Sequence, residues 1–349
     1  VDETEMSKAI AEGGYEAEVK NAEGDSTQQI SQIQEFIDQE VSALIIDPVD
    51  PYALTDILET AKEKSIPVIS YDTLIRNTAA VNYYACDDTR AIGKEVAGQI
   101  IKNMDLDKAR EEKQSYTIEF LMGSTDDNGA LFFCNGVLEK LQEYLDDGTL
   151  VCKSGNMTFD STGILRWDQD AAQAKMKSIL DEFYQEEKTP NIIITASDEF
   201  AIGVQELLEE RGILSDSEEW PVITGYGSEM QAVKDVAEGK ITLTTYLDRK
   251  ELAQGGAKMA LDYLAGEKVD VKDYSQYDNG TKIVGTFTCG AQLIDKDNYQ
   301  ILVDNGTYDE EEIKPDPTPT ATPEPTATPE PTLTPEVTSD PEATITPKA

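Results

Sequence analysis

Two stretches of the sequence decide the fold: VISYDTLIRN at positions 68–77 and LMGSTDDNGALFFCNG at positions 121–136. In each stretch an apolar run stops at polar and acidic residues, and a helical pattern follows. A parallel strand that is buried on both faces has this continuous apolar character, and its carboxyl end faces the ligand crevice of an open sheet. The two stretches therefore predict parallel strands whose ends bind something small and polar.

Strand-like and helix-like segments alternate on both sides of these stretches. Strands are expected at positions 15–19, 43–47, 67–71, 81–85, 116–122, 150–154, 191–195, 221–225, 241–246 and 282–288. Helices are expected ahead of residue 13 and at positions 26–39, 51–64, 89–104, 131–145, 170–184, 199–211, 229–238 and 250–264. Such alternation is typical of βαβ units with right-handed crossovers. We therefore expect an α/β fold of two doubly wound parallel-sheet lobes, with the charged segment 105–114 as a crossover between them.

The composition argues against several classes of function. The formal net charge is −40, and the sequence contains no histidine. Nucleic acids and anionic lipids carry the same sign of charge, so they are not expected as partners. Without histidine, Ser-His-Asp and Cys-His catalysis and the H-E-x-x-H zinc motif are excluded. An enzyme with this sequence would need carboxylates alone.

The four cysteines are spread singly, without a C-x-x-C pair, at positions 86, 134, 152 and 289. Each lies in or beside an apolar run, which favours buried free thiols that behave as small hydrophobic side chains. A disulfide between Cys134 and Cys152 is the alternative, and the sequence does not decide the pairing.

The two ends of the sequence differ in character. The sequence starts at Val1 inside a helical pattern, without a signal-peptide pattern, and contains no apolar run long enough to span a membrane. This start indicates a processed or truncated amino terminus. From Pro315 onward a proline recurs every second or third residue, which predicts an extended acidic linker. Such Thr-Pro-rich segments are typical of stalks outside the cell, and an inert disordered tail is an equal alternative.

The motifs, taken in order, resemble those of type I periplasmic sugar-binding proteins. The resemblance rests on VISYDTLIRN (68–77), VNYYACDDTRAIG (81–93), GSTDDNGALFFCNGVLEKL (123–141), KSGN (153–156), ILRWDQDAAQAKM (164–176), ASDEFAIG (196–203) and DNGTKIV (278–284). Within this family the sequence is similar to the xylose-binding and multiple-monosaccharide-binding receptors of ABC importers. The likeness runs from about Met6 to Tyr308 and covers the whole expected globular part.

The resemblance implies two lobes that are joined by three crossovers and close on one sugar without catalysis. The expected lobes are residues 1–112 with 249–281 and residues 113–248 with 282–312, followed by a disordered tail at 313–349. Family members begin with a strand and a loop that place basic and aromatic side chains in the cleft, and neither is found here. We therefore expect the sequence to be a fragment of a longer product that carries a signal peptide and a lipid anchor.

Carried over residue by residue, the binding residues of the family are only partly present. Three motifs are kept at least in part: Tyr71-Asp72-Thr73 has the acid of a Tyr-Asp-Arg motif but lacks its arginine, Asp127-Asn128-Gly129 has the first amide of an Asp-Asn-Asn motif, and the Arg166-Trp167 pair is complete. Two positions are changed. Gly225-Tyr226-Gly227 lacks the carboxylate of a Gly-Gln-Asp turn, and Leu247 beside Asp248 replaces a basic or amide residue. Each lost charged partner is worth roughly 1.5–3 kcal/mol when desolvated. Tyr226, Ser228 and Asp248 are candidate replacements, and we expect an unusual ligand such as a modified or larger sugar.

Six residues are the candidate ligand-binding set: Asp72, Asn128, Arg166, Trp167, Asp198 and Tyr226. Ligand contact is the favoured interpretation for Asp72, which ends an apolar strand, over a helix cap or a turn. For Asn128 and Asp198, capping of the helix that follows is about as good an interpretation as binding. Trp167 is either a core residue or the platform on which a sugar ring stacks. For Phe132 and Phe133, core packing is favoured for at least one of the two.

The predicted function is that of an extracellular solute-binding protein. It would capture a monosaccharide-class sugar by hinge closure and deliver it to the membrane subunits of an ABC permease. The resemblance implies a monomer without cofactor or metal. A sugar-sensing module that presents its closed form to a membrane sensor or chemoreceptor is the main alternative. A repressor effector domain is disfavoured by the negative charge, and a carboxylate-only glycosidase by the lack of a convincing acid pair.

Overall fold

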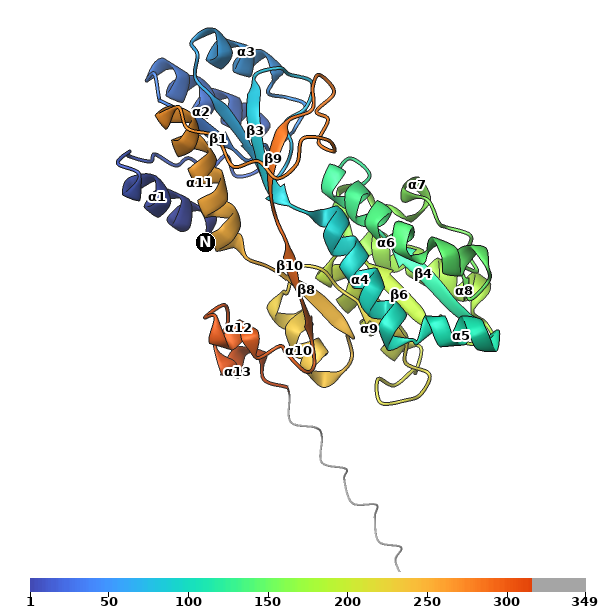
Figure 1. Cartoon of the computed structure of the whole chain (residues 1–349). Coiled ribbons are helices and arrows are strands. Elements are labelled where there is room, and N and C mark those ends of the chain that lie inside the picture. The colour runs from blue at the N-terminus through green and yellow to red at the C-terminus, as the bar shows by residue number, and fades with distance from the viewer. Residues whose placement is uncertain (316–349) are drawn as a thin grey trace, which may run out of the picture. The chain divides into compact units, whose positions relative to one another are not determined.

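The computed structural model describes residues 1–315, which contain two β-sheets (Figure 1). The first sheet has the order β1–β2–β3–β9, with β1 (Leu44–Ile46), β2 (Val68–Tyr71), β3 (Val81–Asp87) and β9 (Gly285–Cys289). The second has the order β10–β8–β7–β6–β4–β5, with β4 (Tyr116–Leu121), β5 (Leu150–Val151), β6 (Ile192–Thr195), β7 (Val222–Thr224), β8 (Leu243–Leu247) and β10 (Ala291–Asp295). Neighbouring strands are parallel except for β10 and β8, which are antiparallel. The predicted α/β class with two parallel-sheet lobes is confirmed.

Helices follow most of the strands. They are α1 (Asp2–Glu12), α2 (Ser26–Asp38), α3 (Thr55–Glu63), α4 (Thr89–Asn103), α5 (Leu106–Glu112), α6 (Asn128–Asp146), α7 (Phe159–Thr162), the 3₁₀ helix η1 (Leu165–Trp167), α8 (Gln169–Phe183), α9 (Asp198–Glu210), α10 (Met230–Glu238), α11 (Arg249–Ala265), α12 (Ile301–Asp304) and α13 (Glu310–Ile313). Aspartates cap five of them, since a side-chain oxygen accepts from first-turn N–H groups at Asp25, Asp88, Asp127, Asp168 and Asp248.

The central strands are buried on both faces, as their apolar sequences predict. Every residue of β2 and of β6 is buried, whereas the neighbouring strands β1, β3, β4 and β7 each include at least one half-buried residue. Glycines let α4 and α6 pack backbone to backbone against the second sheet. A Cβ at Gly93 would lie 2.3 Å from the carbonyl oxygen of Phe133, and one at Gly136 would lie 2.1 Å from that of Arg90. Any side chain at these two positions would push the helices apart.

The chain passes between the two sheets three times. It leaves the first sheet after β3, returns to it after β8, and leaves it again between β9 and β10, which follow each other with one residue between them (Figure 1). The Asp88 N–H donates to the carbonyl oxygen of Cys289 at 2.7 Å and ties two of the crossing segments together. We call residues 1–87 with 249–289 the first lobe and residues 88–248 with 290–315 the second lobe.

These crossings correct the predicted lobe boundaries. Residues 89–112 belong to the second lobe, because α4 packs on α6, and the charged segment 105–114 forms α5 rather than a link. Residues 282–289 belong to the first lobe, since β9 pairs with β3. Ile313 lies in the core rather than in a tail, packed with Val233 and Leu302. The remainder of the predicted tail, 316–349, lies outside the described residues.

One predicted strand does not form, and one strand was not predicted. Residues 15–19 are mostly exposed and do not form a strand, because no neighbouring strand is present to accept their backbone hydrogen bonds. The antiparallel strand β10 was not expected, since AQLID follows β9 after a single glycine and reads as a continuation of it. Its partner β8 fixes it in the second sheet.

The cysteine interpretation is confirmed. All four thiols are free, with Cys86, Cys134 and Cys289 buried and Cys152 half-buried. Burial raises the pKa of the Cys134 thiol to about 11, which fits its role as a small core side chain. Among residues 1–315 no helix is both long enough and apolar enough to cross a membrane.

Candidate ligand-binding site

A cavity of ≈ 220 Å³ lies where the carboxyl ends of strands from the two sheets face each other. This is the place where open parallel sheets bind ligands. The first lobe contributes Asp72, Thr73, Leu74, Tyr84, Cys86, Asp87, Arg249 and Tyr277, and the second lobe contributes Thr89, Asp127, Asn128, Gly129, Ala130, Phe132, Phe133, Trp167, Ala196, Tyr226 and Leu247. Because both lobes supply lining residues, any relative movement of the lobes changes the shape of this cavity.

The structure brings four of the six predicted site residues together. Asp72, Asn128, Trp167 and Tyr226 line the cavity, whereas Arg166 and Asp198 do not. The Arg166 side chain is exposed, and its backbone N–H donates to the Ser124 hydroxyl at 2.7 Å. Arg166 and Trp167 are neighbours in the sequence, but only Trp167 lines the cavity, because consecutive side chains of this irregular turn point in different directions.

Asp72 is held firmly at the end of β2. Its φ of 59° is in the left-handed region, its N–H donates to the Ala85 carbonyl at 2.8 Å, and its own carbonyl accepts from the Tyr84 hydroxyl at 2.6 Å. A strained backbone that is tied on both sides is typical of functional sites. The turn presents the Asp72 carboxylate to the cavity.

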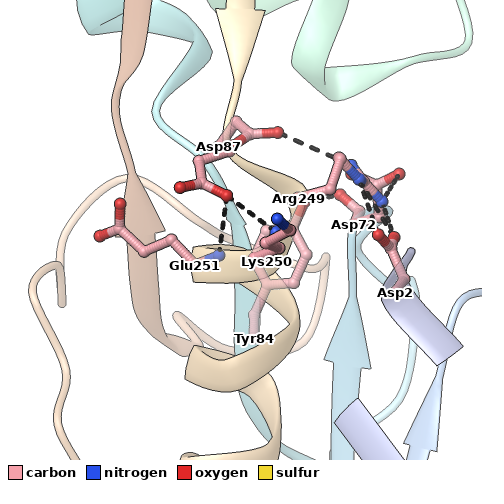
Figure 2. A network of polar contacts seen from close by, with 8 residues as sticks. Asp2, Asp72, Tyr84, Asp87, Arg249, Lys250 and Glu251 are labelled. Atoms are coloured by element: carbon pink, nitrogen blue, oxygen red, sulfur yellow. Dashed lines mark hydrogen bonds and ion pairs between the residues drawn. The ribbon is translucent and has the colours of Figure 1, made fainter. Parts of the chain in front are cut away.

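Arg249, the first residue of α11, faces this carboxylate (Figure 2). Its Nη1 lies 3.2 Å from Asp72 Oδ1, and its Nε lies 3.1 Å from Asp2 Oδ2. Burial opposes the positive charge, but the hydrogen bonds that Arg249 donates to Asp2 and Asp72 and the negative charge of Asp72 outweigh it and raise the pKa of Arg249 above its ordinary value. The guanidinium is therefore permanently charged, and it already forms ion pairs with the carboxylates of Asp2 and Asp72.

Asp87 ends β3 beside this pair and is 6% exposed. Its Oδ2 lies 3.9 Å from Arg249 Nη1, and its Oδ1 has no hydrogen-bond partner in residues 1–315. Burial raises the pKa of Asp87 to about 7, the negative charge of Asp72 adds to the effect, and Arg249 opposes it. A buried oxygen without a partner is costly, so this acceptor is the feature of the cavity that most needs an explanation.

The opposite wall begins α6. Asp127 is the cap of this helix, with its Oδ1 accepting from the Gly129 N–H at 2.7 Å. Burial raises the pKa of Asp127, while the backbone hydrogen bonds from Gly129 and Ala130 oppose the change. Asn128 is the first residue of the helix rather than its cap. Capping therefore does not use the Asn128 amide.

Aromatic rings cover the rest of the wall. Tyr277 meets Tyr84 and Phe132 edge to face, with ring centroids 5.4 Å apart in both pairs, and Phe133 meets Tyr226 in the same way at 5.4 Å. Such contacts fix the ring planes and leave apolar faces toward the cavity. Phe133 is 2% exposed and packs in the core, as expected for at least one of the two phenylalanines.

Trp167 is placed by a glycine and a strained turn. Arg166 and Trp167 both have left-handed φ values, of 59° and 55°. A Cβ at Gly123 would lie 2.0 Å from Trp167 Cη2, so the indole ring rests directly on that bare backbone. The ring also lies 6.1 Å from Phe200, at 33°. It is half-buried and lines the cavity, as a stacking platform requires.

Asp198 is a structural residue. It is fully buried, with its Oδ1 accepting from the Thr244 hydroxyl at 2.5 Å and its Oδ2 from the Glu229 N–H at 2.7 Å. Burial raises the pKa of Asp198 to about 7, against the effect of these hydrogen bonds. A Cβ at Gly225 would lie 2.1 Å from its Oδ1, which leaves only glycine at that position. The carboxyl joins β7, β8 and α10 rather than facing the cavity.

Two charged lining residues, Asp87 and Arg249, are not among the six predicted site residues. Asp87 is followed by Asp88, and an Asp-Asp pair at this place in the sequence indicates the start of a helix. In the structure only Asp88 caps α4. Arg249 follows Leu247 and Asp248 at the end of β8, and this position at a strand end was its only signal. The guanidinium that the Tyr71-Asp72-Thr73 motif lacks is thus supplied from another lobe-crossing segment. Within residues 1–315 no group of three or more Cys, Asp and Glu side chains is placed to hold a metal ion.

Comparisons with known proteins agree with this geometry. The periplasmic binding protein domain family matches residues 1–268. The multiple sugar-binding periplasmic receptor ChvE of Rhizobium radiobacter is 32% identical over 314 residues, covering 90% of this chain and 88% of its own. The multiple sugar-binding periplasmic protein SbpA of Azospirillum brasilense is 34% identical, covering 90% of this chain and 87% of its own.

A solved structure is similar to this chain in both fold and sequence. It is an ABC transporter solute-binding protein from Clostridium phytofermentans with bound β-D-glucose, with a TM-score of 0.79 and 32% identity, covering 90% of this chain and 95% of its own. The family match covers well over half of the chain, and the relatives match it over most of their own lengths. The chain therefore belongs to the periplasmic binding protein domain family and has the type I fold of that family.

Proposed function

We propose that this protein is an extracellular solute-binding protein that captures a monosaccharide-class sugar and delivers it to an ABC permease. The observation that carries the proposal is the cavity between the lobes, in which carboxylates, a guanidinium, an amide and aromatic rings face one another. The sugar-binding names of the relatives and the glucose bound to the similar protein of Clostridium phytofermentans support it. The protein works by binding alone, without turnover.

The lining residues match the chemistry of a sugar. Asp72 and Asn128 present planar oxygens and an amide to adjacent hydroxyl groups, in the manner that carbohydrate recognition requires. The half-buried face of Trp167 receives the C–H patch of a sugar ring. Tyr84 and Tyr226 also line the cavity, and the Tyr84 hydroxyl donates to the Asp72 carbonyl.

Binding would close the lobes around the ligand. The three crossing segments are the connections about which two sheet-based bodies move, and the ligand gains its full set of contacts only when both bodies touch it. A ligand that binds the closed form better shifts the population toward it. The closed form is then the state that a permease recognises. We place this activity outside the cytoplasm, at the cell surface or in a periplasm, and propose that a lipid anchor holds the protein there.

Titration calorimetry against pentoses, hexoses and oligosaccharides tests the binding step. At least one monosaccharide is expected to bind, with a stoichiometry of one, and Trp167→Ala is expected to weaken it by about tenfold or more. Trp220→Ala is the matched control, because the Trp220 indole donates to the Lys240 carbonyl at 2.8 Å and does not line the cavity. No heat with any member of the panel would reject the proposal.

Small-angle scattering tests closure separately. The radius of gyration is expected to fall when the sugar identified by calorimetry is added at saturation. An unchanged radius alongside confirmed binding would reject hinge closure and leave sugar binding in place.

A further inference from the structure

We infer that the ligand carries a protonated amino group, so that the preferred guest is an amino sugar rather than its neutral parent. This inference rests on the proposed function and narrows its ligand class. Two independent features of the cavity lead to it: the sign of its charge and the unpartnered acceptor at its base.

The cavity carries more negative than positive groups. Its lining includes three aspartates, Asp72, Asp87 and Asp127, and one cation, Arg249. That cation is already neutralised, because Asp2 and Asp72 both accept hydrogen bonds from its guanidinium. An anionic ligand such as a sugar acid would therefore meet like charges and no free positive group. The charge of the site favours a cation.

Asp87 provides the position for that cation. Its carboxyl is more than nine-tenths buried, lines the cavity, and leaves Oδ1 without a hydrogen-bond partner among the described residues. The neighbouring guanidinium does not satisfy it, since the closest approach is 3.9 Å, to Oδ2 (Figure 2). A donor group of a ligand bound in the cavity would give this oxygen the partner that it lacks.

An ammonium suits this oxygen better than a hydroxyl. It has three donors and no acceptor, and it forms a charge-assisted hydrogen bond with a carboxylate. Its charge also offsets the repulsion that the other carboxylates exert on an ionised Asp87. A neutral hydroxyl supplies one donor and leaves that repulsion in place. The hydroxyls of the same sugar ring remain available to Asp72 and Asn128.

Protonation of Asp87 gives the inference a pH signature. The charged groups that surround this carboxyl are mostly acidic. Asp2, Asp72 and Glu251 favour its protonated form, whereas Arg249 opposes protonation. The neutral side chains of Tyr226 and Cys289 also face it. Because burial raises the pKa of Asp87 to about 7, an ammonium binds by releasing this proton below pH 7. Affinity for an amine is then expected to rise with pH between 5 and 7, by up to about tenfold per unit.

Calorimetry with three matched hexose series tests the inference on the full chain. Glucosamine, galactosamine and mannosamine are each compared with the neutral parent sugar and with the N-acetyl derivative, at pH 7. The N-acetyl compounds keep the nitrogen but lose its charge. One amino sugar is expected to bind at least about tenfold more tightly than both of its neutral counterparts. It should also release protons, measured as a dependence of the binding heat on the ionisation enthalpy of the buffer.

Asp87→Asn assigns the preference to its residue. This change keeps the shape of the side chain and removes its charge, so the amino sugar is expected to lose its advantage over the parent. Glu63→Gln is the matched control, because Glu63 is an exposed residue of α3 in the same lobe and does not line the cavity. Thermal unfolding of both variants checks that they fold, and the pH dependence of the unmodified protein tests the inference without any variant.

The outcomes separate this inference from the proposed function. Tighter binding of an amino sugar that Asp87→Asn abolishes supports the inference. A neutral sugar that binds as tightly as its amino derivative overturns it and leaves the proposed function standing. An amine preference that Asp87→Asn does not change also overturns it, because the charge would then be recognised elsewhere. No binding by any sugar, amino or neutral, overturns both.

Discussion

Asp87 in the first lobe and Asp198 in the second are both buried aspartates near the carboxyl end of a parallel strand, but they have opposite surroundings. Asp87 is the last residue of β3, and Asp198 is the first residue of α9, the helix that follows β6. Each is at least nine-tenths buried, and burial raises the pKa of each carboxyl to about 7. Both oxygens of Asp198 accept short hydrogen bonds from the protein, whereas Oδ1 of Asp87 accepts none within residues 1–315. Burial and pKa therefore do not distinguish a structural carboxyl from a ligand-facing one, but its hydrogen-bond partners do.

Replacement of each residue by alanine gives the largest expected contrast. Asp198→Ala leaves the Thr244 hydroxyl and the Glu229 N–H without an acceptor in the core, and we expect it to lower the free energy of unfolding by about 3 kcal/mol. Asp87→Ala leaves no donor of Oδ1 without its acceptor and removes a buried charge, so we expect no comparable loss of stability. Urea unfolding at pH 7.5 measures both. Equal losses for the two variants would break the comparison.

The pH dependence of stability gives the next largest effect. The carboxyl of Asp87 has an ordinary pKa of 3.8 in the unfolded chain and about 7 in the native state, so the native state holds its proton more tightly. Unfolding therefore releases a proton between pH 4 and 7, and the stability that this carboxyl contributes below pH 4 is lost as the pH rises through 7. Asp87→Asn is expected to be more stable than the unmodified protein at pH 8, by roughly 1–3 kcal/mol.

The same difference must disappear in acid. At pH 4 the Asp87 carboxyl is protonated in the native state, so Asp87→Asn is expected to match the unmodified protein there within about 0.5 kcal/mol. Chemical unfolding at pH 4, 6 and 8 measures the trend. A variant that is less stable at pH 8 would mean that the ionised Asp87 has a stabilising partner after all.

The order of strands and helices could be predicted from the sequence because each central strand carries its own signal. Continuous apolar runs such as IIIT in β6, followed by a capping aspartate or serine and a helical pattern, need no knowledge of distant residues. The lobe boundaries could not be predicted, because α4 and α5 have the same amphipathic pattern whichever sheet they cover. The contact of Gly93 with the backbone of Phe133 assigns α4 to the second lobe, and that contact is tertiary.

The candidate site could be predicted only in part, for a similar reason. Asp72 directly follows β2, and Tyr226 comes two residues after the end of β7, so the position at a strand end places them in the cavity. Asp198 follows a strand in the same way, yet Gly225 lets it approach the next strand and turn inward. Arg249 reaches Asp72 from a segment 177 residues away in sequence, and local patterns carry no information about such a pair.

Arg249 gives a smaller effect, which tests the ion pairs around Asp87 in the first lobe. Arg249→Gln leaves the Asp2 and Asp72 carboxylates without their shared cation, and we expect it to lower the free energy of unfolding by about 1–2 kcal/mol. Because Arg249 also opposes the raised pKa of Asp87, its loss is expected to move the pH transition of Asp87 above 7. Lys250→Gln is the control, since Lys250 is the exposed neighbouring cation. A pH transition that stays at 7 in Arg249→Gln would show that Arg249 does not act on Asp87.

The smallest expected effect concerns the second lobe, where Trp167 rests on the bare backbone of Gly123. In Gly123→Ala the new Cβ would lie 2.0 Å from Trp167 Cη2, so the half-buried indole has to shift into the cavity. We expect a loss of about 1 kcal/mol in the free energy of unfolding and a weakening of sugar binding by roughly tenfold, since the stacking face moves. Gly98→Ala, in α4 with no atom within 4 Å of the new Cβ, is the matched control and is expected to retain full affinity. If Gly123→Ala bound sugar as well as Gly98→Ala does, Trp167 would be a core residue at the edge of the cavity, and the Asp87 side of the cavity alone would hold the ligand.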